Sequence, residues 1–340
     1  MKVKLCLGAC IFIRLSSHFQ SAWAEMVRVG RAGLISDAGI YIALEKGYFK
    51  EYGIDTELSP AMAAGKLMAS LATGDLDVVA GGVSPGFFNS VARGMPVVMV
   101  ADKGSFPPGR GFNMIVVRKE LWDRGEVRSV KDLKGRPVAT NAMSSPVVYE
   151  WAKALEKVGL TLADVDLKEI AFGLMVTALE KKAIDAAIMG EPHATRAQEM
   201  NVGVILLTMD RDEGTPNMQV AAIFYSREFA EKKAELAKKW MVAYLKGVRF
   251  YNQAVKEGGS KLEELIQILI KHTGVKERKV YDKVVWAGLN PDGFVNRESM
   301  ADQQKFYNEA GWVPETTPVE QFVDDSFVKH ALQVLGGYRP

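Results

Sequence analysis

The sequence contains very little cysteine and histidine. Its two cysteines, Cys6 and Cys10, lie near the N-terminus, and four histidines are spread over 340 residues. Residues 25–340 therefore contain no thiol for a disulfide, a cysteine nucleophile or a cysteine-ligated metal. His193 has no second histidine near it in the sequence, which disfavours a histidine metal site. We therefore expect neither a metal nor a cofactor.

Excess charge and long apolar runs are also scarce. The formal net charge is +2, and removal of residues 1–24, which carry three basic and no acidic side chains, changes it to −1. A chain with so little net charge does not indicate nucleic acid as a partner. After the N-terminus, no apolar run approaches the roughly 20 residues that cross a bilayer. The length suits two domains with substantial cores.

The N-terminus has the layout of a secretory signal peptide. Lys2 and Lys4 precede an apolar run at residues 5–13, and residues 22–24 read A-W-A, an A-x-A cleavage site. We expect residues 1–24 to be removed on export. Residues 7–10, LGAC, also resemble a lipoprotein cleavage box, so lipidation of Cys10 stays open as the alternative.

Residues 76–91 combine a strand, a glycine turn and the start of a helix. An apolar, β-branched run leads into Gly81 and Gly82, which let the backbone reverse. Ser84 is a favourable N-cap residue, and Pro85 suits the first helical position. Because a helix N-terminus presents free N–H groups at the carboxyl edge of a sheet, this junction predicts half of a binding site.

Residues 137–153 repeat this arrangement. A short strand is followed by the small polar residues 141–144, and Ser145-Pro146 again combines an N-cap residue with a proline at the first helical position. Two such junctions, each suited to an anion, predict a ligand clamped between two lobes.

The rest of the chain alternates short β-branched runs with segments of helical periodicity. This alternation is typical of α/β domains with mostly parallel sheets. Strands are expected at residues 27–31, 54–58, 76–80, 97–101, 112–118, 137–140, 167–170, 186–189, 204–207 and 219–225. Helices are expected at residues 40–52, 62–73, 236–255, 261–272, 276–286, 297–310 and 319–335.

Several short blocks resemble one family of proteins. They are residues 42–55 (IALEKGYFKEYGID), 74–77 (GDLD), 132–135 (DLKG), 184–186 (IDA) and the dipeptide at 191–192 (EP). With these blocks the chain resembles the periplasmic substrate-binding proteins for aliphatic sulfonates, taurine, nitrate and thiamine-precursor pyrimidines. The resemblance covers nearly the whole exported chain, and its A-x-E-K-G-Y-F block at residues 43–49 is specific.

The resemblance implies the type II periplasmic binding fold, with two α/β lobes that close around a ligand by hinge motion. Residues 25–115 and 222–340 are expected to form lobe 1, with the C-terminal helices packed on it, and residues 116–221 to form lobe 2. Crossover strands are expected at residues 112–118 and 219–225. The implied function is capture of a small solute in the periplasm for the membrane permease of an ABC importer, by a monomer without enzymatic activity.

Loops at the carboxyl ends of the strands supply the contacts in this family. Structural interpretations stand beside a ligand role: Ser84 and Ser145 as helix caps, Tyr41 and Phe172 as core residues, and His193 as a packed side chain. The candidate ligand-binding residues are Ser36, Asp37, Tyr41, Gly82, Val83, Ser84, Lys103, Asn141, Ser144, Ser145, Phe172, Gly173, Glu191 and His193.

Two enzymatic alternatives are open. Residues 82–86 satisfy G-x-S-x-G, the nucleophile elbow of α/β-hydrolases, with Ser84 as the nucleophile. However, Pro85 follows the serine and has no N–H to donate to an oxyanion. The second alternative is an enzyme on the binding-protein fold itself, of the pyrimidine-synthase or menaquinone-pathway type. The pyrimidine synthases carry a cysteine-rich motif that the exported chain lacks.

Some candidate residues favour an anionic ligand and others favour a cationic one. Helix N-termini, serine hydroxyls and the side chains of Lys103 or Arg110 favour an oxoanion, whereas Asp37 and Glu191 suit an amine. We expect a small organic anion, such as a sulfonate or carboxylate with an apolar tail.

Overall fold

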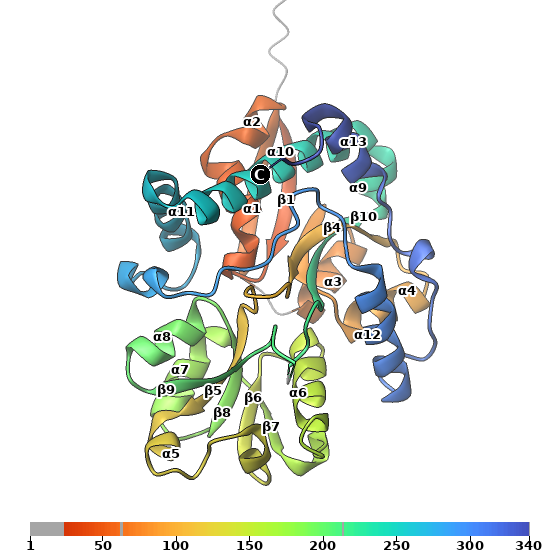
Figure 1. Cartoon of the computed structure of the whole chain (residues 1–340). Helices are drawn as coiled ribbons and strands as arrows, with labels where there is room; N and C mark the ends of the chain where they lie inside the picture. The colour runs from red at the N-terminus through yellow and green to blue at the C-terminus, as the bar shows by residue number, and fades with distance from the viewer. Residues whose placement is uncertain (1–23, 62–63, 213, 340) are drawn as a thin grey trace, which may run out of the picture.

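The protein has two lobes, which lie one above the other in Figure 1. This computed structural model describes residues 24–61, 64–212 and 214–339. The expected export signal, with Cys6 and Cys10, lies outside the described residues. Within the described ranges, no helix is both long and apolar enough to cross a membrane.

Lobe 1 is built on a five-stranded sheet in the order β2-β1-β3-β10-β4. Strands β1, β2 and β3 pair in parallel, and β10 is inserted antiparallel between β3 and β4. The strands are β1 (Glu25–Arg31), β2 (Ile54–Ala61), β3 (Val78–Gly82), β4 (Val97–Ser105) and β10 (Gln219–Ser226). Except for β10, all of them run in one direction, as the alternation of strands and helices predicts.

Lobe 2 repeats this plan with the order β7-β6-β8-β5-β9. Here β5 is the strand inserted antiparallel, between β8 and β9. The strands are β5 (Asn113–Arg118), β6 (Pro137–Thr140), β7 (Asp166–Glu169), β8 (Ala186–Gly190) and β9 (Gly203–Thr208). Each sheet therefore contains one reversed strand, and it is the strand that directly follows a crossing between the lobes.

The crossings differ from those expected. The chain leaves the first sheet after Ser105 and enters the second at Asn113, and it returns between Thr208 and Gln219. The expected crossover strands are instead ordinary strands of a single sheet, because β5 and β10 each pair on both sides within one lobe. Residues 113–115 and 219–221 consequently lie in the lobe opposite to the one expected.

Helices cover the faces of both sheets. The expected helix at 40–52 is two helices, because Gly47 adopts a left-handed conformation with φ of 73°. Lobe 1 has α1 (Ala38–Glu45), α2 (Tyr48–Glu51), α3 (Ala64–Ala72), α4 (Pro85–Ala92) and the short helix η1 (Ile35–Asp37); lobe 2 has α5 (Lys119–Asp123), α6 (Pro146–Glu156), α7 (Phe172–Glu180), α8 (His193–Glu199), η2 (Val130–Leu133) and η3 (Leu162–Asp164).

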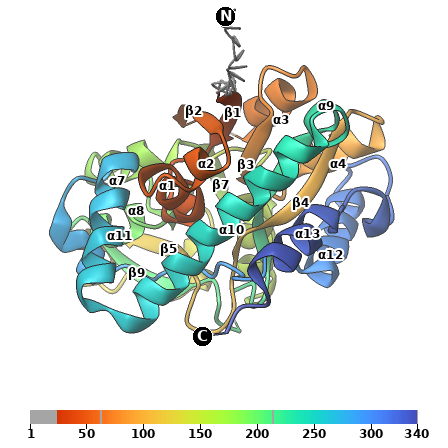
Figure 2. The same cartoon turned by 90° about the horizontal axis from the view of Figure 1, so that it is seen from above.

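The C-terminal region packs mainly on lobe 1. Helix α10 runs across the top of that lobe beside α1 (Figure 2). Gly247 allows the two helix backbones to come into contact, because a Cβ atom added at this position would lie only 2.1 Å from the carbonyl oxygen of Gly39. The expected apolar face of α10 is buried, from Leu236 to Tyr251. The region contains α9 (Arg227–Lys232), α10 (Ala234–Glu257), α11 (Gly259–His272), η4 (Arg278–Asp282), α12 (Arg297–Glu309), η5 (Val319–Gln321) and α13 (Ser326–Leu335).

Two helix expectations in this region are wrong in extent. The segment expected at 276–286 contains only the 3-10 turn η4, and the one expected at 319–335 is split into η5 and α13. Helix α12 also contacts lobe 2, where it lies against α6 (Figure 1). The C-terminal region therefore connects the lobes in addition to covering lobe 1.

Candidate ligand-binding cleft

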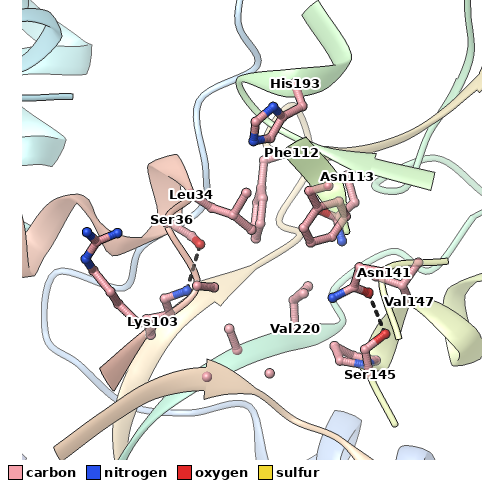
Figure 3. A pocket seen from close by; sticks show the side chains of 18 of the residues that line it. Leu34, Ser36, Lys103, Phe112, Asn113, Asn141, Ser145, Val147, His193 and Val220 are labelled. Carbon is pink, nitrogen blue, oxygen red and sulfur yellow. Dashed lines mark hydrogen bonds between the residues drawn. The ribbon is translucent and has the colours of Figure 1, made fainter. Parts of the chain in front are cut away.

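A cavity of about 430 Å³ lies between the lobes. Its size falls in the range of sites that enclose small organic molecules. Both lobes and the segment after α11 contribute to its wall, which contains both apolar and polar side chains (Figure 3). The lining residues are Arg31, Ala32, Gly33, Leu34, Ser36, Leu67, Gly81, Gly82, Lys103, Phe112, Asn113, Asn141, Ser145, Pro146, Val147, Ala171, Phe172, Gly173, His193, Val220, Ala221, His272, Thr273 and Gly274.

The two expected junctions come from opposite lobes and meet at the wall of this cavity. Gly82 ends β3, and Pro146 begins α6 in the opposite lobe. A Cβ placed on Gly82 lies only 2.6 Å from Cδ of Pro146, so a side chain at this position cannot be accommodated without movement. Helices α6 and α7 both begin at the cavity wall, and their N-terminal N–H groups favour a negatively charged ligand group.

The first lobe contributes two cations with different surroundings. Lys103 is buried within β4, not in a loop, and its Nζ lies 2.8 Å from Oδ1 of Asp37 and 3.0 Å from Oγ of Ser36. Arg31 ends β1 and donates to the Tyr41 hydroxyl, but among the described residues it has no carboxylate partner and its buried Nε has no acceptor. Asp37 offsets the charge of Lys103, so Arg31 is the cation left available to a ligand.

The second lobe contributes neutral polar groups. Asn113 begins β5 and donates through Nδ2 to both carboxyl oxygens of Glu150, at 2.8 and 3.1 Å. Burial raises the pKa of Glu150 to about 8. Burial, together with the nearby charge of Arg196, lowers the pKa of His193 to about 4, so its imidazole is neutral near neutral pH.

The hydroxyl of Ser145 is not the expected helix cap. It lies 2.6 Å from Oδ1 of Asn141 and 2.8 Å from the carbonyl oxygen of Ala142, and makes no capping bond to the described backbone of α6. The hydroxyl donates to the preceding loop, and its oxygen accepts no hydrogen bond from the described N–H groups of the helix. Because its Oδ1 accepts from Ser145, Asn141 keeps its amide Nδ2 as a donor beside the cavity (Figure 3).

Eight of the candidate residues line the described cavity, and the other candidates lie behind its wall or elsewhere. Asp37 accepts at Oδ2 from the N–H groups of Gly33 and Leu34 and from the Tyr41 hydroxyl, and Tyr41 stacks on His272. The described lining includes Ser36, Gly82, Lys103, Asn141, Ser145, Phe172, Gly173 and His193, and omits Asp37, Tyr41, Val83, Ser84, Ser144 and Glu191.

The candidates outside the cavity wall have structural contacts. Ser84 is fully buried and accepts from the N–H of Phe87 as the N-cap of α4, which confirms its capping interpretation. Val83 is a core residue. Glu191 accepts from both the N–H and the hydroxyl of Thr195, and burial raises its pKa to about 7. Since Ser84 is engaged in the cap and away from the described cavity wall, the hydrolase alternative loses its nucleophile.

Several cavity residues escaped the sequence analysis. Arg31 is the last residue of β1, so the strand-end rule that selected other candidates could have found it. Asn113 follows the crossing and sits at the start of β5, where no such rule applies. His272 and the following residues 273–274 come from the end of α11, and only the packing of α11 on α1 brings them to the cavity.

The lobes touch on both sides of the cavity. The N–H of Ile35 in lobe 1 donates to the Glu191 carbonyl oxygen in lobe 2 at 3.3 Å. The N–H of Val285, after η4, donates to Oε1 of Glu191 at 3.1 Å. On the opposite side the Tyr149 hydroxyl of α6 bonds to Asp302 of α12. These contacts connect the two lobes beside the cavity.

The described residues contain no group of three or more histidine, cysteine, aspartate or glutamate side chains arranged to hold a metal ion. The charged side chains in the described lining are Arg31 and Lys103, and the N-termini of α6 and α7 also lie at the cavity wall.

Solved structures with the same fold are numerous, and three serve as examples. The periplasmic aliphatic sulphonate binding protein SsuA from Escherichia coli is 20% identical, with 88% of this chain and 92% of that chain covered at a TM-score of 0.68. The alkanesulfonate-binding protein SsuA from Xanthomonas axonopodis pv. citri bound to MOPS is 16% identical, with 88% and 98% covered and a TM-score of 0.70. The periplasmic nitrate-binding protein NrtA from Synechocystis PCC 6803 is 18% identical, with 92% and 89% covered and a TM-score of 0.71.

These likenesses confirm the type II periplasmic binding fold. A comparison of the sequence with curated proteins gives no significant match. The family model described as NMT1/THI5 like matches residues 35–255, which is more than half of the chain. The chain therefore belongs to the NMT1/THI5-like family.

Proposed function

We propose that the protein is the solute-binding component of an ABC importer and captures a small organic anion between its lobes in the periplasm. The observation that carries this proposal is the inter-lobe cavity, in which Arg31 presents a guanidinium without a carboxylate partner among the described residues. Nη1 of Arg31 donates to the Tyr41 hydroxyl and to the His272 carbonyl oxygen, which are both neutral acceptors. A partly buried guanidinium without a carboxylate partner favours a carboxylate or sulfonate, to which it donates charge-assisted hydrogen bonds.

The carboxylates that suited an amine ligand are engaged elsewhere. Asp37 pairs with Lys103 and accepts three further hydrogen bonds, and Glu191 accepts from Thr195 and from the N–H of Val285. Neither of them is in the described cavity lining. A cationic ligand group therefore meets Arg31 with no carboxylate exposed to balance it, and an anion is favoured.

The cavity volume distinguishes organic from inorganic anions. At about 430 Å³ the space is far larger than an ion such as nitrate needs. The apolar wall includes Leu34, Phe112 and Phe172, against which a hydrocarbon or aromatic body can pack. Sulfonates and carboxylates with an apolar body match both features, and the SsuA proteins of the same fold bind sulfonates according to their names.

The remaining parts of this proposal rest on the family resemblance. They are delivery to a membrane permease, export to the periplasm through a cleaved signal, and action as a monomer without catalysis. An enzyme on the same fold that depends on a cysteine side chain is disfavoured, because residues 24–340 contain no cysteine.

A thermal-shift screen tests the proposal. Organic sulfonates and carboxylates, organic amines and neutral solutes are added separately to the protein, and Tm is recorded at rising concentration. A ligand that binds only the folded form raises stability with the logarithm of its concentration over Kd. We expect at least one organic anion to raise Tm in this way, and shifts confined to amines or neutral solutes contradict the proposal.

A further inference from the structure

Two buried polar atoms in the lobe 2 wall have no hydrogen-bond partner among the described residues. They are Oδ1 of Asn113 and Nδ1 of His193, whose residues are only 2% and 6% exposed. Both residues line the cavity on the lobe 2 side, across from Ser36 and Lys103 (Figure 3). Buried polar atoms in folded proteins normally have partners, so an unpaired couple in a binding cavity requires an explanation.

Glu150 pairs with the nitrogen end of the Asn113 amide. Both carboxyl oxygens of Glu150 are within hydrogen-bond distance of Nδ2 of Asn113. Oδ1 of Asn113 has no partner among the described residues. Glu150 in turn has Asn113 as its one hydrogen-bond partner among the described residues, so the amide has one paired end and one unpaired end.

His193 is held beside Asn113 by the strand pairing of lobe 2. Asn113 pairs with Gly190 in the β5–β8 ladder, and the chain then reaches His193 at the start of α8. A neutral imidazole carries one donor nitrogen and one acceptor nitrogen. Asn113 and His193 together thus offer an acceptor and a group that can donate or accept.

An apolar ligand tail at this position leaves these buried atoms without partners. A ligand group that supplies one hydrogen bond to such a buried polar atom typically strengthens binding by roughly tenfold relative to a ligand that supplies none. Simple alkyl anions are therefore poorly matched to this wall, although they satisfy Arg31.

We propose that the ligand is a bifunctional organic anion: its charged group binds at Arg31, and a second polar group, a hydroxyl, amide or ring nitrogen, binds between Asn113 and His193. This inference rests on the proposed function, since it assumes that the anionic end is bound at Arg31. It adds the second recognition point and makes Asn113 and His193 determinants of specificity.

Matched ligand pairs test the second recognition point. Alkanesulfonates from propane- to hexanesulfonate are compared with their ω-hydroxy counterparts by isothermal titration, so that chain length scans the distance between the two ends. We expect one ω-hydroxy compound to bind roughly tenfold more tightly than its parent. Equal binding of every parent and its hydroxylated partner overturns the inference while leaving the proposed function intact. No binding by any member of the series contradicts both.

Two variants show whether the preference comes from the named atoms. Asn113→Leu and His193→Phe each replace a side chain that carries one of the unpaired polar atoms with an apolar side chain of similar size, and Asn113→Leu also removes the Nδ2 donor to Glu150. Each is expected to reduce the preference for the hydroxylated compound to less than threefold while the parent sulfonate binds at least as well as before. The urea unfolding midpoint of each variant shows that it is folded. A preference that persists in both folded variants overturns the assignment.

Discussion

The contact between Gly82 and Pro146 makes a sharp prediction about closure. An ideal Cβ on Gly82 lies 2.6 Å from Cδ and 2.8 Å from Cγ of Pro146. Carbon atoms in favourable contact are about 3.5–4.0 Å apart, so Gly82→Ala creates an overlap of about 1 Å. The proline ring is fused to the backbone at the start of α6 and cannot rotate away. Only the separation of the lobes relieves the overlap.

The expected cost falls on the closed form alone. Overpacking of this kind typically costs about 1–3 kcal/mol, and in the open form Gly82 and Pro146 are no longer in contact. A ligand that needs contacts from both lobes then binds less tightly by the same energy, which is about 5- to 150-fold in Kd. Isothermal titration of the tightest organic anion from the thermal-shift screen gives the affinity, and small-angle X-ray scattering gives the degree of closure.

Two further variants make this test decisive. Gly86→Ala adds the same methyl group at the second residue of α4, where its nearest neighbour is Oγ of Ser84 at 3.6 Å, and it should leave the affinity unchanged. Pro146→Ala added to Gly82→Ala removes the ring and should restore most of the lost affinity. Wild-type affinity in Gly82→Ala, or no rescue by the second substitution, refutes the idea that closure brings these residues together around the ligand.

Three other perturbations follow from the same contacts. Burial raises the pKa of Glu150 from 4.5 to about 8, so protonation of Glu150 stabilises the folded protein fully below about pH 4.5, and this stabilisation is lost as the pH rises through about 8. In urea denaturation, the free energy of unfolding of Glu150→Gln relative to that of wild type should therefore rise between about pH 5 and about pH 9. A difference that stays constant with pH contradicts the burial effect. Tyr149→Phe removes the hydrogen bond to Asp302 between the lobes, so titration should show about fivefold weaker ligand binding, whereas unchanged affinity means that this contact does not favour closure. Ser84→Ala removes the N-cap of α4 and should lower the free energy of unfolding by about 1 kcal/mol with no change in Kd, and a large loss of affinity argues that Ser84 reaches the ligand.

Local turn chemistry made the framework of the cavity predictable. The glycine turn before Ser84-Pro85 and the Ser145-Pro146 pair each mark a strand–turn–helix junction, and the structure has β3–α4 and β6–α6 at those positions. The preferences of serine for the N-cap and of proline for the first helical turn act over a few residues, so they can be read without knowledge of the fold.

Hydrogen-bond partners were less predictable because they depend on distant neighbours. The charge of Lys103 is offset by Asp37, which lies far away in the sequence, and only the packing of η1 against β4 brings them together. The Ser145 hydroxyl donates to Asn141 and its oxygen accepts no bond from α6, an arrangement that the residue types alone do not decide. Nδ2 of Asn113 pairs with Glu150 in another element.

The role of Arg31 is the central claim, and one titration tests it directly. Arg31→Gln removes the charge at the cavity and keeps a polar side chain, whereas Lys50→Gln removes an equal charge from an exposed position on α2. A hydrogen bond to a charged partner contributes about 2 kcal/mol, or roughly thirtyfold in Kd. Isothermal titration with the tightest organic anion should show that loss for Arg31→Gln and wild-type affinity for Lys50→Gln. Equal affinity of Arg31→Gln and wild type contradicts the account, because the anion then binds without the guanidinium on which the proposed function depends.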